Sequence, residues 1–442
     1  MPIRDLTIVA VVIVALPFCL ARPWIGVLTW SWLAYMNPHR LAWGFSTALP
    51  LSQAVAIATL VGFVFCRDRR RSLMSAETIL LVALWGWVTV TSVFALYPDD
   101  AWEKWMEFSK VLLMALLTIP LFQDRRRLRI LVLVIAGSIA FFGFKGGIFA
   151  LLTGGESMIL GPFGSFIGAN TEIALALNMT LPLLALLARE ERRRRVRIAL
   201  HVVFVLTIIA VPFTYSRGGV LGLIAVLTLL FVNARRRLLL VPVLAVGLIA
   251  FSHFAPQQWD DRMETIRTYE TEGSAQLRMM SWRVAYQVAT DYPLTGGGFR
   301  VLHHREIYDR YLPEYPRAFG HDAHSIYFNF LCDYGWIGLL LFGALIGCTL
   351  SSLWKLGRAS GKTPETAWIS DYASMIQVSL IAWLLNGAFL SVAYFDLAYH
   401  LIIITVVLKA MAAAAPAAVT AAAATPPRPV LWPGVVPRAR RV

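Results

Sequence analysis

The chain has 442 residues, of which 58% are hydrophobic and 15% are charged. Soluble domains average roughly 45–50% apolar and about 25% charged residues, so the composition excludes a soluble enzyme, a disordered chain and a disulfide scaffold. The 40 Lys and Arg residues against 26 Asp and Glu give a net charge of +14. An apolar chain with surplus basic residues is a membrane protein, a nucleic-acid-binding protein or both, and the positions of the arginines decide.

Half of the basic residues fall in five short clusters between long apolar stretches. A nucleic-acid-binding face would gather arginines on one folded surface with polar surroundings. These arginines lie instead at the ends of apolar segments, which is the positive-inside pattern. We therefore predict no nucleic-acid partner and place all five clusters in the cytoplasm. The clusters are Arg67–Arg71, Arg125–Arg129, Arg189–Arg197, Arg235–Arg237 and Lys355–Lys362.

Apolar stretches close to the ~20 residues that a helix needs to cross hydrocarbon predict the membrane spans. The N-terminal runs 6–20 and 24–36 are short and are divided by Arg22-Pro23, so we interpret them as one broken or re-entrant element. With an even number of crossings between clusters, about twelve helices result and both termini lie inside; if both short runs span, the N-terminus lies outside. The other predicted spans are 47–66, 77–95, 108–122, 130–152, 172–188, 198–214, 217–233, 238–254, 326–354, 372–391 and 393–412.

The spans divide the chain into four parts. We predict N-terminal transmembrane helices over residues 1–254, a loop outside the membrane over 255–325, C-terminal transmembrane helices over 326–412, and a disordered cytoplasmic tail over the Ala- and Pro-rich residues 413–442. The N-terminal run lacks the basic region and the cleavage site of a signal peptide, so we expect it to be retained.

The loop over 255–325 is long enough to be functional. It holds eight arginines, no lysine and ten acidic residues, a net charge of −2. Its arginines are therefore not markers of topology. Arginine gives planar, bidentate recognition of phosphate or carboxylate, and surface ion pairs are the alternative for most of the eight.

The sequence Tyr215-Ser216-Arg217-Gly218-Gly219 places an arginine between two apolar segments at the outer face. A charge at membrane depth is costly and is usually functional. The glycines expose backbone N–H groups at the start of the next helix, whose dipole favours anions. This pattern predicts a phosphate site; an arginine that snorkels from a short loop is the alternative.

Residues 275–290 predict an amphipathic helix, with Leu277, Met280, Val284 and Val288 at helical spacing. Such a helix lies at the outer membrane interface or caps the bundle. Arg278 and Trp282 are four residues apart and share a face of it. We expect the glycines at 296–298 to form a flexible turn.

His321-Asp322-Ala323-His324 lies where the loop re-enters the membrane. Histidine can act as a general base near neutral pH. The spacing also admits a metal site, although no further ligands stand beside it in the sequence.

Two weaker metal candidates stand elsewhere in the outer segments. One is the pair His303-His304 with Glu306, and the other is Asp99-Asp100, which is similar to the acidic pair of metal-dependent lipid-phosphosugar glycosyltransferases. Adjacent acids in a turn are common, and we predict no metal and no cofactor.

These motifs resemble the O-antigen ligase superfamily, which includes O-antigen ligases, O-antigen polymerases and bacterial protein O-oligosaccharyltransferases. The resemblance covers nearly the whole chain except the tail. The start of the chain and residues 393–400 are similar to an O-glycosylation ligase subgroup associated with exosortase loci. The matching pieces are residues 215–219, Arg278 with Trp282, 292–299, 324–327 and 333–339 around the outer loop, and 22–24, 35–40 and 393–400 for the subgroup.

The resemblance implies an all-helical, GT-C-like fold of about twelve transmembrane helices with a large periplasmic loop containing short helices. It implies transfer of a glycan from undecaprenyl pyrophosphate to an acceptor hydroxyl without metal. Arg217 and Arg278 would then bind the pyrophosphate, and His324 would be catalytic.

Further residues would support this site: Arg283, His321, Asp322, Trp282 and Lys145, the last being a lone cation inside a predicted span. For Lys145 a snorkelling or interhelical role is the alternative. No carboxylate pair at glycosidase spacing can be argued from the sequence, so we expect a single displacement with inversion.

The expected setting is the bacterial inner membrane, with the active site facing the periplasm. Lipid A–core oligosaccharide is the expected acceptor; protein hydroxyls or another glycan repeat unit, as in a polymerase, keep the same mechanism. A transporter of the lipid-linked glycan is the alternative of another class, but transporters place ionisable groups near the midplane, whereas these candidates cluster at the outer face.

Overall fold

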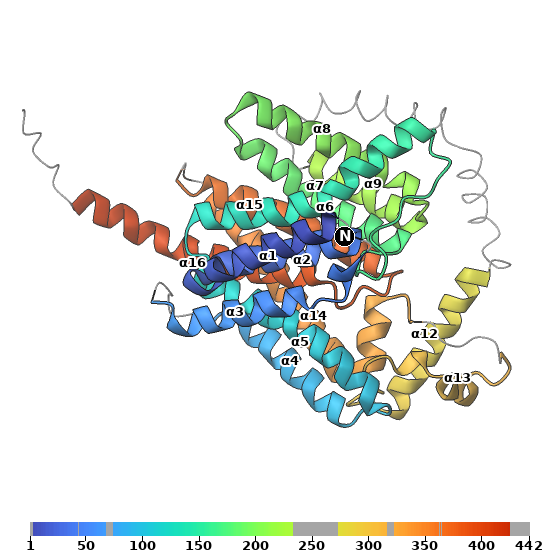
Figure 1. Ribbon diagram of the computed structural model, residues 1–442. Helices are drawn as coiled ribbons and strands as arrows, with labels where there is room; N and C mark the ends of the chain where they lie inside the picture. Colours follow the sequence, from blue (N-terminus) through green and yellow to red (C-terminus); the bar gives the residue numbers. More distant parts are fainter. Residues whose placement is uncertain are drawn as a thin grey trace, which may run out of the picture.

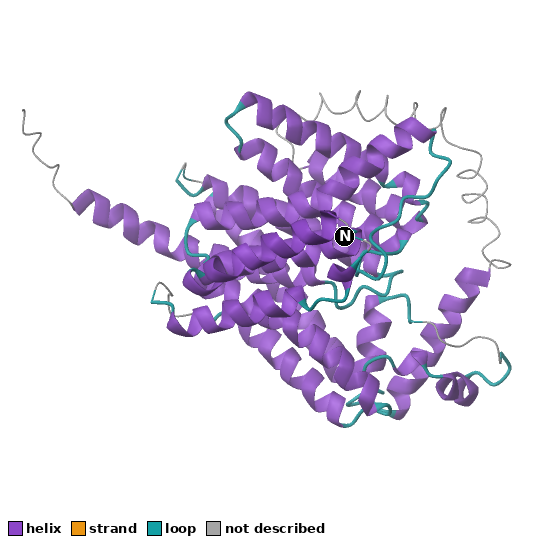
Figure 2. Ribbon diagram, in the orientation of Figure 1, coloured by secondary structure: helices purple, strands orange, loops and turns teal. Residues whose placement is uncertain are grey.

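The computed structural model describes residues 3–42, 44–67, 74–232, 273–315, 322–361, 363 and 365–424, and for 273–275 and 415–424 it describes the backbone alone. Every regular element in these ranges is a helix (Figure 2), which confirms the predicted all-helical fold. The α-helices are α1 (Ile3–Ala21), α2 (Pro23–Met36), α3 (Leu51–Phe65), α4 (Ala76–Val93), α5 (Pro98–Leu121), α6 (Arg125–Thr153), α7 (Asn170–Glu190), α8 (Arg194–Ala210), α9 (Arg217–Val232), α12 (Gly273–Asp291), α13 (Arg305–Tyr311), α14 (Ile326–Ser360), α15 (Ala367–Gly387) and α16 (Asp396–Ala424).

Each predicted span from 47–66 onward that falls within the described ranges coincides with one of these helices. The predicted span 238–254 lies outside the described residues. Among the described helices, seven are long and apolar enough to cross a membrane, while α3 and α9 are apolar but shorter. The count of twelve crossings is not confirmed and stays a prediction.

The two short N-terminal runs form separate helices, α1 and α2, that pack against each other and against α3 (Figure 1). Pro23 opens α2 at its first position, where the missing N–H has no helical partner to lose. Gly26 and Gly62 allow the close approach, because a Cβ at Gly26 would overlap Thr59 and one at Gly62 would overlap the Leu20 carbonyl. The predicted broken element thus consists of two packed helices divided at Arg22-Pro23, and the number of times they cross the membrane stays a prediction.

Ion pairs gather the basic residues of α6 and of the α7–α8 turn at one end of the bundle. Arg125 Nη2 lies 2.6 Å from Glu190 Oε1, and Arg129 Nη2 lies 2.7 Å from Glu191 Oε2. We call this the basic end, defined by residues 125–129 and 189–197. The opposite end, which we call the site end, holds the start of α7, α9 and α14 and the loop 388–395 after α15.

The C-terminal helix is longer than predicted. α16 continues past residue 412 to Ala424 and projects from the bundle at the left of Figure 1. The helix thus extends into residues 413–424 of the predicted tail, an alanine-rich stretch of high intrinsic helix propensity, and the disorder of the tail stays a prediction. Residues 425–442 lie outside the described residues.

Helix α14 is interrupted at Gly335, whose φ of 67° and ψ of −168° are readily adopted only by glycine. The interruption frees the carbonyls of Cys332 and Asp333 from their helical partners. The N–H groups of Gly297 and Gly298 bond to these two carbonyls at 2.8 and 3.0 Å. The prediction of a flexible turn over 296–298 is therefore wrong, because these glycines are buried and fixed against α14.

The predicted amphipathic helix is confirmed as α12. Val284 and Val288 on its apolar stripe are fully buried, and Leu277 and Met280 are partly buried. The stripe belongs to a small second core with residues of α13 and α14, at the right of Figure 1. The apolar face of α12 thus contacts protein, and the helix caps the bundle.

Candidate active site

The segment around His324 is held from both sides. His324 has a φ of 48°, a left-handed conformation that is uncommon outside glycine. Its N–H donates to Ser391 Oγ at 3.1 Å. The preceding carbonyl, that of Ala323, accepts from Trp282 Nε1 at 2.7 Å, and the Trp282 indole stacks on Phe328 with centroids 5.2 Å apart. Helix α12 and the loop before α16 therefore fix the backbone at His324, whose side chain is half-buried.

Arg278 lies one turn before Trp282 on α12, so the two side chains share a face of the helix. Both are half-buried. Ser281, one position before Trp282, anchors the helix to α13 through a 3.0 Å hydrogen bond with the Tyr308 hydroxyl. Because Trp282 reaches the backbone beside His324, Arg278 faces the same side of the molecule.

Arg217 opens α9 and is half-buried. The chain reverses just before it, where Tyr215 has a φ of 54°. Ser216 Oγ accepts from the Gly219 N–H at 3.0 Å, so this N–H of the helix start is already bound, contrary to our expectation that it is exposed for an anion. Gly219 instead allows close packing, because a Cβ there would overlap the Ala174 side chain of α7.

Close helix contacts place the start of α9 at the same end of the bundle as His324. A Cβ at Gly222 of α9 would overlap Asn386 near the end of α15, and one at Gly387 would overlap Ile326, the first residue of α14. Arg217 lies little more than one turn before Gly222. These contacts place the start of α9, with Arg217, and the His324 segment at the site end, and Trp282 joins the helix that carries Arg278 to the same segment.

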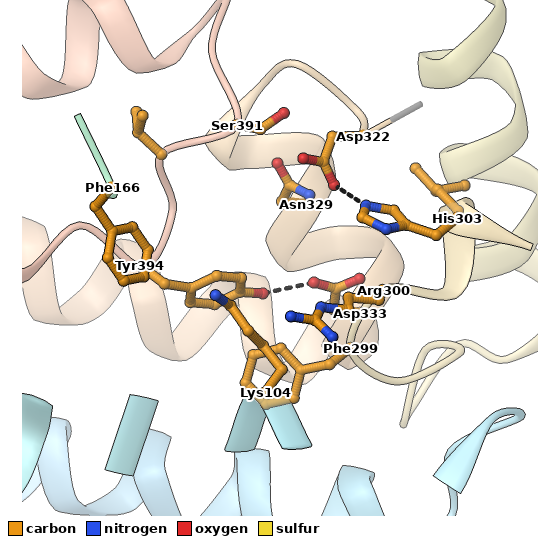
Figure 3. A pocket seen from close by; sticks show the side chains of 12 residues that line it. Lys104, Phe166, Phe299, Arg300, His303, Asp322, Asn329, Asp333, Ser391 and Tyr394 are labelled. Carbon is orange, nitrogen blue, oxygen red and sulfur yellow. Dashed lines mark hydrogen bonds and ion pairs between the residues drawn. The ribbon is translucent and has the colours of Figure 1, made fainter. Parts of the chain in front are cut away.

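A cavity of about 210 Å³ opens beside the His324 segment (Figure 3). Ser391, which receives the His324 N–H, lines it together with Asp322. Side chains from α5, the loop between α6 and α7, the outer loop, α14 and the loop 388–395 complete the wall. The lining residues are Lys104, Phe166, Phe299, Arg300, Leu302, His303, Asp322, Asn329, Asp333, Ser391, Val392 and Tyr394.

Two cations of the cavity wall carry acidic partners. Lys104 Nζ lies 2.8 Å from Glu107 Oε2 and 4.7 Å from the centroid of the Phe166 ring. Arg300 Nη1 lies 3.4 Å from Glu103 Oε1. Both acids come from α5, one turn or less from Lys104. This helix therefore supplies Lys104 itself and the two carboxylates that pair with the cations of the cavity wall.

His303 and Asp322 form the third charged pair, with His303 Nε2 and Asp322 Oδ1 2.6 Å apart. The hydrogen bond to Asp322 raises the pKa of His303 above its usual range, against the opposing effect of burial. Burial alone would raise the pKa of Asp322, but the hydrogen bond and charge of His303, with the charges of His324 and Lys104, hold it below its usual range. The pair therefore favours an imidazolium facing a carboxylate.

Buried oxygen acceptors complete the wall. Asp333 Oδ2 accepts from the Tyr394 hydroxyl at 2.5 Å, and burial raises the pKa of Tyr394 so that the phenol stays protonated and donates. Asn329 Oδ1 is buried and has no hydrogen-bond partner among the described residues. A buried acceptor without a donor is costly and is usually explained by a ligand or an ordered water.

Other predicted residues lie away from this cavity. Arg283 is exposed and pairs with Glu314 at 3.4 Å, within the outer helices. Lys145 is exposed on α6 and does not line the cavity, because the glycines beside it turn the other face of α6 toward α8. His321 lies outside the described residues.

The sequence reasoning missed Lys104, Arg300 and Asn329 as wall residues, and it weighed His303 only as a metal ligand. Lys104 carried a usable signal, since it is a cation at the outer end of a predicted span, where the positive-inside pattern disfavours it. The sequence carried no signal for Asn329, because this residue stands out only through the burial of its amide oxygen in the folded structure.

The residues weighed as metal ligands serve other contacts. His304 Nε2 lies 2.9 Å from Asp100 Oδ2, and its ring stacks on Tyr97 with centroids 3.3 Å apart. Within the described ranges, no three or more His, Cys, Asp or Glu side chains converge as a metal site would require. Asp100 and His304 thus link α5 to the outer loop.

Comparison with known families finds a match for the part of the chain that carries Arg217, Arg278 and His324. Residues 202–343 match the family model described as O-antigen ligase. This match supports membership of the chain in the O-antigen ligase superfamily. Members of this family are glycosyl-transferring enzymes of the O-antigen ligase type, and the many apolar helices identify the chain as a multi-pass membrane protein.

The matched O-antigen ligase region contains Arg217, Arg278 and His324. Residues 3–191, which include Lys104, match a family model described as a family of unknown function. A search of the curated proteins finds no match.

Proposed function

We propose that this O-antigen ligase family member transfers a glycan from undecaprenyl pyrophosphate to an acceptor hydroxyl at the periplasmic face of the bacterial inner membrane. One observation carries the proposal. Arg217 and His324 lie on segments at the site end, and the helix of Arg278 contacts the His324 segment through Trp282. Because basic residues mark the cytoplasmic side, this placement opposite the basic end favours chemistry on the other side.

In this mechanism Arg217 and Arg278 bind the pyrophosphate. The acceptor hydroxyl oxygen attacks the anomeric carbon, the bond between that carbon and the pyrophosphate oxygen breaks, and negative charge develops on the leaving oxygen. Fixed guanidinium groups stabilise that charge without reorganising, and their bidentate geometry suits phosphate. A single displacement inverts the configuration at the anomeric carbon.

His324 accepts the proton of the attacking hydroxyl. Proton transfer by a positioned side chain contributes typically about 10²–10⁴-fold to a rate, provided that the base is held in place. The hydrogen bonds from Trp282 and to Ser391 on either side of His324 supply that restraint. Trp282 is thus a positioning residue, and Asp322 contributes as a charged group two residues away.

For the acceptor, lipid A–core oligosaccharide remains our proposal, with a protein hydroxyl or a further repeat unit as the alternatives. All three present a hydroxyl to the same base, so the described residues of the site serve each of them equally. The acceptor is therefore identified by the assay and not by the mechanism.

The test uses the purified full chain in proteoliposomes with undecaprenyl-pyrophosphate-linked glycan and each acceptor class in turn. We expect release of undecaprenyl pyrophosphate coupled to a mass increase of one acceptor. Arg217→Ala, Arg278→Ala and His324→Ala should each abolish release while the protein keeps its melting behaviour. A chelator should leave turnover unchanged.

Arg283→Ala is the matched control. It removes an arginine from the same helix as Arg278, but an exposed one already paired with Glu314. We expect it to retain activity, which would also remove Arg283 from the residues that support the site. Full activity of Arg278→Ala, or a strict need for a divalent cation, would contradict the proposed mechanism.

A further inference from the structure

The cavity beside His324 is unsuited to a phosphate group. Its described cations Lys104, Arg300 and His303 each face a carboxylate at 2.8, 3.4 and 2.6 Å. Asp333 adds a further acid, which a tyrosine hydroxyl and no cation contacts among the described residues. Each of these cations is thus engaged by an acid, so a pyrophosphate bound here would have to compete with a carboxylate for every one of them.

The cavity is instead rich in hydrogen-bond acceptors. Asn329 is 7% exposed and Asp333 is 3% exposed. Figure 3 shows the Asn329 amide next to Asp322 and the Asp333 carboxylate next to Tyr394 on the cavity wall. Asn329 Oδ1 has no donor among the described residues. These acceptors suit a neutral ligand with several hydroxyl donors, because each hydroxyl can satisfy one of them.

The size and the apolar part of the wall fit one sugar ring. A volume of about 210 Å³ is small and suits a ligand the size of one sugar ring. It lies below the roughly 300–1,000 Å³ of pockets for larger ligands. The rings of Phe166, Phe299 and Tyr394 supply apolar faces between the polar groups.

The cavity also lies beside His324, the proposed catalytic base. Ser391 lines the cavity and accepts the His324 N–H, and Asp322 of the wall precedes His324 by two residues. A sugar bound here would therefore stand next to the base of the proposed transfer, where either the acceptor sugar or the first sugar of the donor glycan must lie.

We infer that this cavity is a subsite for a single pyranose ring of the substrate, bound through ring hydroxyls that donate to Asn329 and Asp333. The inference rests on the proposed glycan transfer for the source of the sugar. The binding chemistry does not depend on it. Asn329→Ala removes the unpartnered acceptor, and Val392→Trp fills the cavity from a side chain that is 6% exposed.

The first experiment measures KM for donor and for acceptor in the proteoliposome assay. A neutral hydrogen bond contributes about 0.5–1.5 kcal/mol, so Asn329→Ala should raise one of the two KM values about two- to tenfold with kcat nearly unchanged. A change in the acceptor KM assigns the ring to the acceptor, and a change in the donor KM assigns it to the donor glycan.

The second experiment needs no catalysis. Saturation-transfer NMR on the full chain in nanodiscs, with methyl glycosides of glucose, galactose and N-acetylglucosamine, should show binding that Asn329→Ala weakens and Val392→Trp abolishes. Gln287→Ala is the matched control, since Gln287 Oε1 is also buried and without a partner among the described residues, but Gln287 does not line the cavity.

The outcomes separate the two proposals. Transfer by the wild-type chain with both KM values and the glycoside signals unchanged in Asn329→Ala and Val392→Trp overturns the subsite and leaves the proposed function standing. Glycoside binding that requires Asn329, with no transfer from any donor, supports the subsite and overturns the proposed function. An equal effect of Gln287→Ala would show a general structural response and would also overturn the subsite.

Discussion

Replacing Trp282 with phenylalanine removes one hydrogen bond next to His324 and keeps an aromatic ring for Phe328. The Ala323 carbonyl that loses its donor belongs to a fully buried residue, and an unsatisfied buried group costs about 1–3 kcal/mol. The segment can relieve that cost by moving, and a displacement of about 1 Å at a reacting group can reduce a rate about 10²-fold. We expect Trp282→Phe to reduce kcat about 10- to 100-fold with little change in the donor KM.

The assay is release of undecaprenyl pyrophosphate under saturating donor and acceptor. The control is Trp85→Phe, which removes a similar indole hydrogen bond, 2.8 Å to Ser109 Oγ between α4 and α5, and neither of these residues lines the cavity. Both variants should melt at lower temperature, but only Trp282→Phe should lose kcat. A Trp282→Phe enzyme with wild-type kcat would refute the idea that this indole positions His324.

Three further predictions follow from the described contacts. Gly335→Ala should lower the free energy of unfolding by about 3 kcal/mol or more, because alanine is strained at that φ and its Cβ would overlap a carbonyl, whereas Gly343→Ala on the same helix meets open space; melting curves compare them, and equal curves contradict the strain. The folded-state pKa of His303 is raised, so its ion pair stabilises fully below about pH 6.5, and this stability is lost as the pH rises through the raised pKa. The melting-temperature advantage of wild type over His303→Gln should therefore shrink at alkaline pH, and a constant gap would argue against the pair. Lys104→Ala should reduce transfer about tenfold, because Lys104 lines the proposed sugar cavity and hydrogen bonds to charged groups contribute about 1.5–3 kcal/mol, while Lys145→Ala, at a residue that does not line it, should leave transfer unchanged; the reverse order in the same assay would contradict the placement of the sugar in this cavity.

Much of the helical layout is readable from the sequence, because local rules decide it. Apolar length predicts the helices in order, and the spacing of Val284 and Val288 identifies the buried face of α12 before any contact is known. Pro23 correctly marks the division between α1 and α2. Local rules fail where tertiary contacts decide, as at residues 296–298, where three glycines indicate flexibility but are fixed by carbonyls that the interruption at Gly335 sets free.

The candidate site is only partly predictable for the same reason. Arg217 and Arg278 stand out because arginine is unexpected at the outer end of apolar segments. Lys104 and Asn329 become site residues only when α5, α14 and the outer loop meet, and Lys145 is excluded by the direction in which α6 faces. A single sequence carries the type of a residue and its spacing along one element, but not which residues of separate elements meet around a cavity.

The ion pairs of the cavity wall help to locate the reacting anomeric carbon of the proposed transfer. In the cavity each described cation faces an acid, so binding an anion there would require breaking an ion pair, and the leaving pyrophosphate would gain little. Arg217 and Arg278 do not line the cavity, yet they lie at the same end of the bundle. The reacting anomeric carbon should then stand at the boundary between the two regions, with the sugar on the compensated side and the phosphate toward the arginines. His324 is the residue at that boundary, since it follows Asp322 of the cavity wall and is held by Trp282 of the Arg278 helix. In the proposed mechanism, a base at this boundary is the group that takes the proton of the acceptor hydroxyl.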